Sequence, residues 1–295
     1  MATERQQLAR ADRVELQELA EGLDALQVAR PVSEHPAVRL ARALAPRLAV
    51  IVALVLVWQL VVVLHVKPTY ALPAPGDVWA KLVEQARAGH LPEAIFTSLR
   101  RAALGYTAAL VVGTLVGVAV ARLGLLGTGV GSLLAALLSL PSVTWVPIGI
   151  LWFGLSDATI YFVVILGAFP SIARGVISAF GQIDPLILRL ASSLDARGPA
   201  LYRHFLLPAA LPGYVAGMQQ AWAFSWRSLM AAELIAISPQ LGLGLGQLLD
   251  SGRELADMPL ALAAMIGILA VGLAVDELLF RPLERGVLRR RGLAR

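Results

Sequence analysis

Several uninterrupted apolar runs, each about 20 residues long, are the feature that most restricts the fold of this 295-residue chain. A helix of that length, rising 1.5 Å per residue, crosses the ~30 Å hydrocarbon core of a bilayer. The charged fraction is only 15%, so little sequence remains for a separate soluble domain. We therefore predict an all-α membrane protein with six transmembrane helices, at about residues 48–66, 98–121, 128–153, 159–180, 211–237 and 259–280.

Composition excludes several functional classes. The chain has no cysteine, so disulfides, thiol nucleophiles and thiolate metal sites are excluded, and its four histidines are too scattered to suggest a zinc site. The net charge of +5 comes largely from loop arginines, which fits membrane orientation better than nucleic-acid binding. No G-x-x-x-x-G-K-[ST] phosphate loop occurs, so we do not expect this chain to bind nucleotide.

Arginine is concentrated in one set of the predicted loops, which contains residues 181–210 and both termini. The positive-inside bias places this set in the cytoplasm. We divide the chain into a cytoplasmic helical extension (1–47), a transmembrane domain (48–285) and a basic cytoplasmic tail (286–295). Leucines at three- and four-residue spacings between Leu16 and Leu26 fit either a surface helix or a docking contact for a cytoplasmic partner.

Proline and glycine mark special positions in the apolar runs. Pro141 and Pro147 bracket the sequence LPSVTWVP in the third run, which predicts a broken or kinked helix. Such a break either lines a wet cavity or is a purely structural kink, and both interpretations stay open. The segments GTLVG (113–117) and GTGVG (127–131) have the small-residue spacing that lets helices in lipid approach closely.

The segment Arg189–Pro212, RLASSLDARGPALYRHFLLPAALP, is a basic loop between two apolar runs. It predicts two short helices broken at Gly198–Pro199, with Pro208 and Pro212 bracketing entry into the next span. A chain this apolar has little reason to carry such a loop unless a partner contacts it at the membrane surface. The loop therefore indicates a membrane protein that is driven by a partner.

This loop resembles one in the permease subunits of binding-protein-dependent ATP-binding-cassette (ABC) importers, whose pattern is E-A-A-x3-G-x9-I-x-L-P. The matching positions are Ala191, Leu207 and Pro208. Phe205 replaces the isoleucine, Arg189 the glutamate and Asp195 the glycine. The resemblance implies a coupling loop that docks on an ATPase through Arg189, Ala191, Leu194, Asp195, Ala196, Arg197, Gly198, Leu201, Phe205, Leu207 and Pro208.

Other segments resemble the importer branch for aliphatic sulfonates, taurine and nitrate, over about residues 48–285. They are LPSVTWVPIGILWFGLSD, FPSIARGV, WRSLMAAELI and GLGLG. The resemblance implies the type I importer permease fold, a non-catalytic subunit of the cell inner membrane and a homodimer. Its implied partners are two ATPase subunits, which would hold the ATP and Mg²⁺, and an extracytoplasmic binding protein. An aliphatic sulfonate or related small anion is the expected substrate, with nitrate, taurine or another small organic nutrient as alternatives.

The fifth apolar run contains two charges, Arg227 and Glu233. An arginine near the centre of a span costs about 2.5–3.5 kcal/mol, so it should face a cavity or a partner. Six residues correspond to about 240° around a helix, so the two side chains do not share a face, whereas Gln220, seven residues before Arg227, does share a face with it. Arg227 either pairs with a group on a neighbouring span or lines the translocation path. The candidate path residues are Trp145, Gln220, Trp226, Arg227 and Glu233, the last as a structural or gating residue.

Two other functional classes compete with the importer. A secondary transporter driven by an ion gradient would be favoured by inverted internal repeats, and no clear one is visible. An intramembrane enzyme would need a cluster of acid, base or metal-binding residues in the spans, where only Arg227 and Glu233 are deeply placed. Copurification with an ATPase and dependence of uptake on ATP distinguish the three classes.

Overall fold

The computed structural model describes residues 36–122 and 125–289, and these ranges contain helices and no strand. The predicted helix of the N-terminal extension and the end of the basic tail lie outside the described residues. The chain separates into two compact units, one ending at Leu60 and the other beginning at Val61. The described part of the first unit is a segment of α2 (Pro36–Val63), whose apolar stretch Leu48–Val63 falls within the first predicted span.

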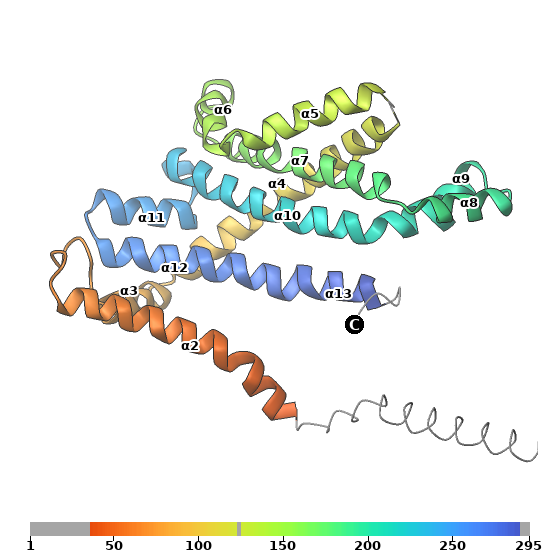
Figure 1. Ribbon diagram of the computed structural model, residues 1–295. Helices are drawn as coiled ribbons and strands as arrows, with labels where there is room; N and C mark the ends of the chain where they lie inside the picture. Colours follow the sequence, from red (N-terminus) through yellow and green to blue (C-terminus); the bar gives the residue numbers. More distant parts are fainter. Residues whose placement is uncertain (1–35, 123–124, 290–295) are drawn as a thin grey trace, which may run out of the picture. The chain divides into compact units, whose positions relative to one another are not determined.

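The second unit is a bundle of helices of very different lengths (Figure 1). Its elements are α3 (Pro75–Arg87), α4 (His90–Ala121), α5 (Leu125–Ser139), η1 (Ser142–Trp145), α6 (Val146–Phe153), α7 (Asp157–Gly181), α8 (Pro185–Ser193), α9 (Gly198–Leu201), η2 (Tyr202–Leu206), α10 (Leu207–Ile235), η3 (Pro239–Leu241), α11 (Leu245–Glu254), α12 (Met258–Val275), η4 (Asp276–Phe280) and α13 (Arg281–Arg289).

Three helices among the described residues are long and apolar enough to cross a bilayer, and one bent pair could form a fourth span. The three are His90–Ala121, Asp157–Gly181 and Met258–Arg289, which contain the predicted spans 98–121, 159–180 and 259–280. The fifth predicted span corresponds to α10, which is 29 residues long but is diluted by glutamines, Arg227 and Glu233. The number of six spans therefore remains a prediction.

The bent pair confirms the break expected in the third apolar run. Gly129–Ser139 and Ser142–Phe153 meet at an angle of 93°, with Pro141 at the corner and Pro147 in the first turn of α6. Each proline suits its place because it cannot donate a backbone hydrogen bond and is tolerated at the start of a helix. The bend directs α6 away from the line of α5 (Figure 1).

Small residues allow α7 to pack closely between α4 and α10. A Cβ atom added to Gly113 or Gly117 of α4 would lie 2.7 Å from side-chain atoms of α7, which confirms close packing at GTLVG. The second motif, GTGVG, packs closely at one end only: a Cβ at Gly127 would lie 2.8 Å from the carbonyl oxygen of Val120 on α4, whereas a Cβ at Gly131 would meet nothing within 4 Å. On the other side of α7, the backbones of Gly175 and Gly217 touch, and a Cβ on either would lie 2.9 Å from the other's Cα.

Hydrogen bonds, a salt bridge and aromatic contacts also join the helices of the second unit. Tyr106 donates to the carbonyl of Met218 at 2.8 Å and packs edge-on against Trp222 and Phe280. At the start of α12, Asp257 accepts a salt bridge of 3.2 Å from Lys81 of α3. Hydrogen bonds to Glu84 and Asp257 raise the pKa of Lys81, because both carboxylates favour its charged form.

The contact between Gly175 and Gly217 predicts a specific sensitivity. Gly217→Val should destabilise the protein by about 1–3 kcal/mol, because the new side chain overlaps the backbone of α7. Gly129→Val on α5 is the matched control, since a Cβ there meets nothing within 4 Å. Thermal unfolding of the detergent-solubilised protein measures the effect, and equal melting temperatures for the two variants would contradict the prediction.

Candidate functional site

A buried ion pair joins α4 to α10. The side chains of Arg101 and Glu233 are both fully buried, and Nη1 of the arginine lies 3.0 Å from Oε1 of the glutamate. The same guanidinium donates through Nε to Asp157 Oδ1 at 2.8 Å, at the start of α7, and through Nη2 to the carbonyl of Leu241. One arginine thus connects α4, α7, α10 and the segment before α11, which satisfies the demand that a buried charge be paired.

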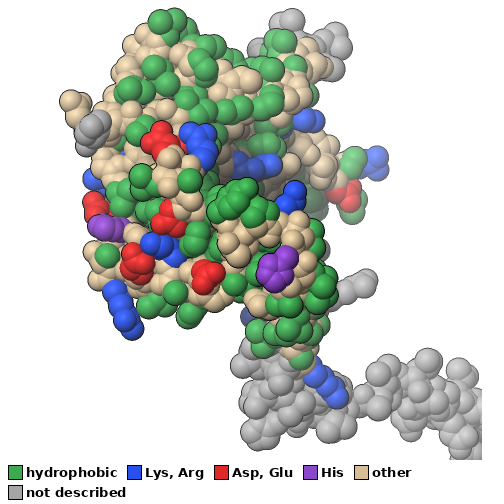
Figure 2. Space-filling model, turned by 90° about the vertical axis from the view of Figure 1, so that its left-hand side faces the viewer, with side chains coloured by type: hydrophobic (Ala, Val, Ile, Leu, Met, Phe, Trp, Pro, Cys, Tyr) green, Lys and Arg blue, Asp and Glu red, His purple; other side chains and the backbone are tan. Residues whose placement is uncertain are grey.

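The carboxylate of Glu233 has further donors. Ser98 Oγ lies 2.7 Å from its Oε2, and the backbone nitrogen of Gly246 donates to the same oxygen at 3.0 Å. Ser98 also accepts from the backbone nitrogen of Leu245 at 2.9 Å, so the first turn of α11 is held on the ion pair. This end of the molecule carries charged side chains of both signs among hydrophobic ones (Figure 2).

The sequence GLGLG is explained by this arrangement. Gly242 has a φ of +69°, in the left-handed region that glycine adopts at the lowest steric cost. Cβ atoms at Gly244 and Gly246 would each lie 2.6 Å from atoms of the Glu233 side chain. The last two glycines therefore let the backbone approach the buried carboxylate, a role that the sequence did not reveal.

The buried pair should dominate stability. Arg101→Met leaves Glu233 buried without its cation and is expected to cost about 3–5 kcal/mol. The double variant Arg101→Met/Glu233→Leu should recover part of the loss, because no uncompensated charge remains. Glu84→Ala, which removes an exposed partner of Lys81, is the control and should change stability by under about 1 kcal/mol. Equal melting temperatures for Arg101→Met and Glu84→Ala would show that the pair is unimportant.

Two of the candidate path residues line one cavity. Trp145 and Arg227 border a space of about 290 Å³ together with Phe224 and the bend at 137–143. The guanidinium of Arg227 donates through Nε to the carbonyl of Ala223 at 3.1 Å and lies 4.7 Å from the centre of the Phe224 ring. The side chain is exposed, and these contacts hold it on its own helix.

Gln220, which is also on α10, borders a different cavity from Arg227. It borders a space of about 400 Å³ between α7 and α10, whose other polar side chains are Ser171, Arg174, Ser178 and Gln182. Gln220 and Arg227 are both exposed, as expected for residues seven apart on one helical face. The described residues that line the two cavities include no carboxylate.

The other two candidates lie elsewhere. Trp226 is buried, stacks on Trp222 with ring centres 5.9 Å apart and donates to the carbonyl of Ile268 on α12. Glu233 belongs to the ion-pair cluster with Arg101. Neither borders the cavities described above, so in this structure both are part of the helix packing.

The predicted coupling loop forms two helical pieces, but the break lies before Gly198–Pro199, which begin the second piece, and not at these two residues. α8 ends at Ser193, and helix resumes at Gly198, so residues 194–197 form the break. The backbone nitrogen of Ala196 bonds to the carbonyl of Ala191 at 2.9 Å, and that of Asp195 bonds to Ser192 at 3.1 Å. This pair of bonds is the Schellman ending of a helix, in which one residue takes the left-handed conformation.

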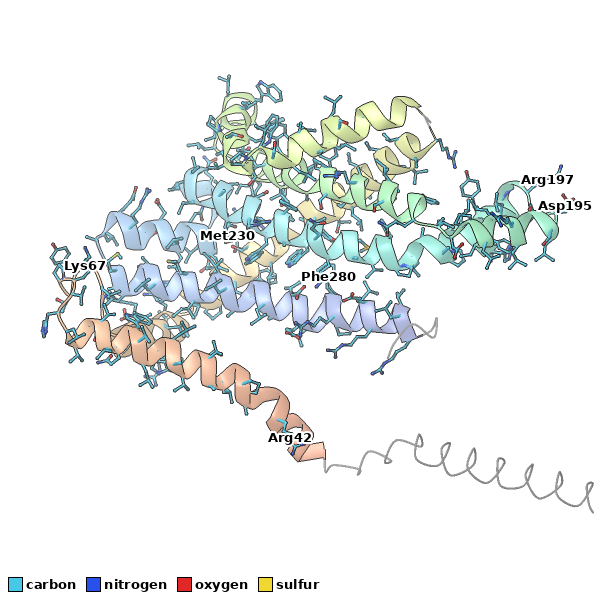
Figure 3. All side chains as sticks on the ribbon, in the orientation of Figure 1. Arg42, Lys67, Asp195, Arg197, Met230 and Phe280 are labelled. Atoms are coloured by element: carbon cyan, nitrogen blue, oxygen red, sulfur yellow. The ribbon has the colours of Figure 1, made fainter. Side chains whose placement is uncertain are left out.

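Asp195 is that residue, with a φ of +48°. The importer pattern has glycine at this position, and glycine reaches positive φ at the lowest steric cost, so the left-handed turn explains the pattern. Asp195 also forms an exposed ion pair with Arg197 at 2.9 Å. Both side chains lie at the tip of the loop, far from the other helices of the second unit (Figure 3). Ala191 is buried, whereas Arg189 and Leu194 are exposed.

The second half of the loop differs from the prediction. Pro208 and Pro212 do not mark the start of a separate helix, because helix runs from Gly198 through η2 into α10. η2 is a π-helical turn, in which the nitrogen of Leu207 bonds to the carbonyl of Tyr202. A single π turn is tolerated inside a helix, so the chain stays helical into Pro208, which has no N–H to donate.

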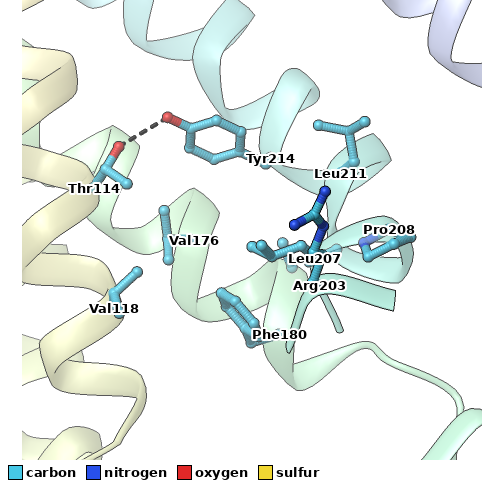
Figure 4. Close-up of a pocket in the computed structure, with 11 residues that line it drawn as sticks. Thr114, Val118, Val176, Phe180, Arg203, Leu207, Pro208, Leu211 and Tyr214 are labelled. Carbon is cyan, nitrogen blue, oxygen red and sulfur yellow. Dashed lines mark hydrogen bonds between the residues drawn. The ribbon is translucent and has the colours of Figure 1, made fainter. Parts of the chain in front are cut away.

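An apolar cavity of about 440 Å³ lies beside this junction (Figure 4). Leu207 and Pro208 of the coupling loop line it with α4 and α7, and Arg203 is the one charged side chain among the described residues that line it. Tyr214 bonds to Thr114 at its edge, at 2.8 Å. The cavity is separate from the polar face that carries Gln220 and Arg227, because different sides of α7 and α10 border the two.

Sequence reasoning missed Arg101, Asp157 and Arg174. Arg101 could have been predicted as a partner of Glu233, because opposite charges in apolar runs tend to pair in the membrane. Arg174 stands in the segment FPSIARGV and, like Arg227, is an arginine inside an apolar run.

Among the described residues, no group of three or more histidine, aspartate or glutamate side chains is placed to hold a metal ion.

A helical membrane bundle with a polar, cavity-lined face and a protruding charged loop defines a transport subunit that a partner drives. The model of the family described as "Binding-protein-dependent transport system inner membrane component" matches residues 109–289, so the chain belongs to this family of ABC transporter permeases. It is a non-catalytic membrane subunit, and the ATPase is a separate partner.

Individual relatives are also transport permeases. The taurine transport system permease protein TauC of Escherichia coli (strain K12) is 30% identical over 257 residues, covering 83% of this chain and 90% of the relative. The putative aliphatic sulfonates transport permease protein SsuC of Bacillus subtilis (strain 168) is 27% identical, covering 82% and 84%. An inward-facing MetNI methionine ABC transporter structure aligns with a TM-score of 0.54 at 21% identity, covering 67% of this chain and 95% of that one. The expected importer permease fold is confirmed.

The turn at Asp195 predicts how the coupling loop tolerates change. Asp195→Gly should preserve copurification with the ATPase, because glycine adopts the left-handed turn readily. Asp195→Val should weaken copurification, since a β-branched residue at this φ costs roughly 1–2 kcal/mol or more. Leu186→Val, exposed on α8 and outside residues 189–208, is the control. Equal ATPase yields from the two Asp195 variants would show that the turn is unimportant.

Proposed function

We propose that this chain forms the translocation path of an ATP-driven importer for aliphatic sulfonates or a related small anion. The observation that supports an anionic substrate is Arg227. Its side chain is exposed on the cavity that Trp145 also borders, and the described residues lining that cavity include no carboxylate to neutralise it. An arginine in a span costs free energy, which an anionic cargo would offset.

The geometry of Arg227 suits an oxyanion. Its Nε is occupied by the carbonyl of Ala223 and its face by the Phe224 ring, so the two terminal nitrogens are left for the substrate. Two parallel N–H donors match two oxygens of a sulfonate or nitrate group. Gln220 continues the same polar face and offers uncharged hydrogen bonds.

The proposed assembly has two copies of this chain, two ATPase subunits that hold ATP and Mg²⁺, and an extracytoplasmic binding protein that delivers the substrate. No cofactor is assigned to this chain. Residues 189–208 would dock on the ATPase, with exposed Leu194, Asp195 and Arg197 at the tip. Closure of the ATPases would then shift the path between its two accessible states, because the ATPases bind the loop differently in each.

The proposed orientation follows from arginine. Both termini and the loop 181–210 would face the cytoplasm of the cell, and the chain would lie in the inner membrane. The ion-pair cluster around Glu233 would then lie toward the outer end of α10. Taurine, nitrate and other small organic nutrients are the alternative substrates, since the relatives include permeases named for taurine and nitrate.

Arg227→Ala should abolish uptake of the substrate while the permease still copurifies with its ATPase. The reason is that the variant removes the cation from the path but leaves the coupling loop unchanged. Arg100→Ala is the matched control, because Arg100 is also exposed on a long helix and borders neither polar cavity. Uptake of radiolabelled sulfonate by cells carrying each variant is the measurement. Normal uptake by Arg227→Ala would remove this residue from the mechanism.

Growth of a deletion strain on single sulfur or nitrogen sources identifies the substrate. Loss of growth on alkanesulfonates but not on taurine would support the main proposal, and loss on nitrate, or on taurine alone, would select an alternative. Failure to copurify an ATPase, together with uptake that persists without ATP, would instead favour a secondary transporter.

A further inference from the structure

Arg174 on α7 carries a second exposed cation on the face that holds Gln220 and Arg227. It borders the 400 Å³ cavity with Gln220 and also a neighbouring space of about 300 Å³ with Ser132 and Ser178. The described residues that line these spaces include no carboxylate. Like Arg227, this arginine lies within a predicted span, where an uncompensated charge is costly.

Contacts between α7 and α10 give the spacing of the two arginines. Gly175 lies against Gly217, and Gly167 lies against Ser228, so the two helices are antiparallel. In this register Arg174 is level with Met218, nine residues before Arg227. At 1.5 Å per residue, the two cations are separated by about 13 Å along the helices. Gln220 lies between them.

The surroundings of the two guanidinium groups differ. Arg227 is held by the carbonyl of Ala223 and the Phe224 ring, whereas the polar neighbours of Arg174 are the hydroxyl and amide groups of Ser171, Ser178 and Gln182. Those groups can hydrogen-bond to an anion without opposing its charge. A small anion leaving Arg227 would therefore meet Gln220 and then a second cation in a polar cavity.

We propose that Arg174 is a second anion-binding residue of the translocation path, to which the substrate passes from Arg227 by way of Gln220. This inference rests on the proposed function, because it assumes an anionic cargo. Two separate cationic positions would let each bind the substrate weakly enough to release it, which transport through a path requires.

This chain contains no cysteine, so a single cysteine introduced at position 174 can be modified by thiol reagents that restore or reverse the charge. Arg174→Cys in the complete transporter, reconstituted in liposomes with its ATPase and binding protein, should reduce anion uptake about tenfold or more, as expected for lost hydrogen bonds to a charged group. Aminoethyl methanethiosulfonate, which adds a positive charge to the thiol, should restore much of the uptake. Sulfonatoethyl methanethiosulfonate, which adds a negative charge, should not.

Arg100→Cys, treated in the same way, is the matched control and should keep its uptake throughout. ATPase activity stimulated by the binding protein is measured in parallel and should persist in Arg174→Cys, because the coupling loop is intact. Equal restoration by both reagents, full uptake without either, or loss of the assembled complex would each overturn the inference. If Arg227→Ala still abolishes uptake in that case, the proposed function stands. If both arginine variants transport normally, the anionic cargo itself is wrong.

Discussion

The buried pair of Arg101 and Glu233 is the interaction on which the arrangement of the long helices depends. A charge inside a membrane bundle must be paired, so the pair brings α4 and α10 together, and Asp157 adds the start of α7. The first turn of α11 completes the cluster through backbone donors to Ser98 and Glu233. One polar cluster therefore determines how several apolar surfaces, which lipid alone would not order, meet at one end.

Away from that cluster, small residues determine how closely the helices pack. Glycines of α4 and α10 let both helices approach the backbone of α7, which explains why this helix lies at the centre of the bundle. The same packing separates two environments. One side of α7 and α10 carries the polar side chains of Arg174, Gln220 and Arg227 at the edges of cavities, and the other borders an apolar cavity beside the coupling loop.

The sequence predicted the class of protein, the bend at Pro141 and the two-piece loop, because each follows from local composition or from the chemistry of one residue. It also placed Gln220 and Arg227 on one face, since seven residues make nearly two turns of helix. It could not tell that Trp226 faces the core, because periodicity groups residues without showing which neighbour each group meets. The partner of Glu233 was missed for the same reason, since Arg101 is 132 residues away along the chain.

The contact between Gly175 and Gly217 has a mechanical consequence. Where two helix backbones touch, neither can slide past the other without overlap, so α7 and α10 should move as one rigid plate. The segment from residue 182 to 206 is attached to both helices at the same edge of that plate. A force applied to Asp195 and its neighbours would therefore turn both helices together, and the cations on the plate would be reoriented as a set, with their mutual spacing unchanged.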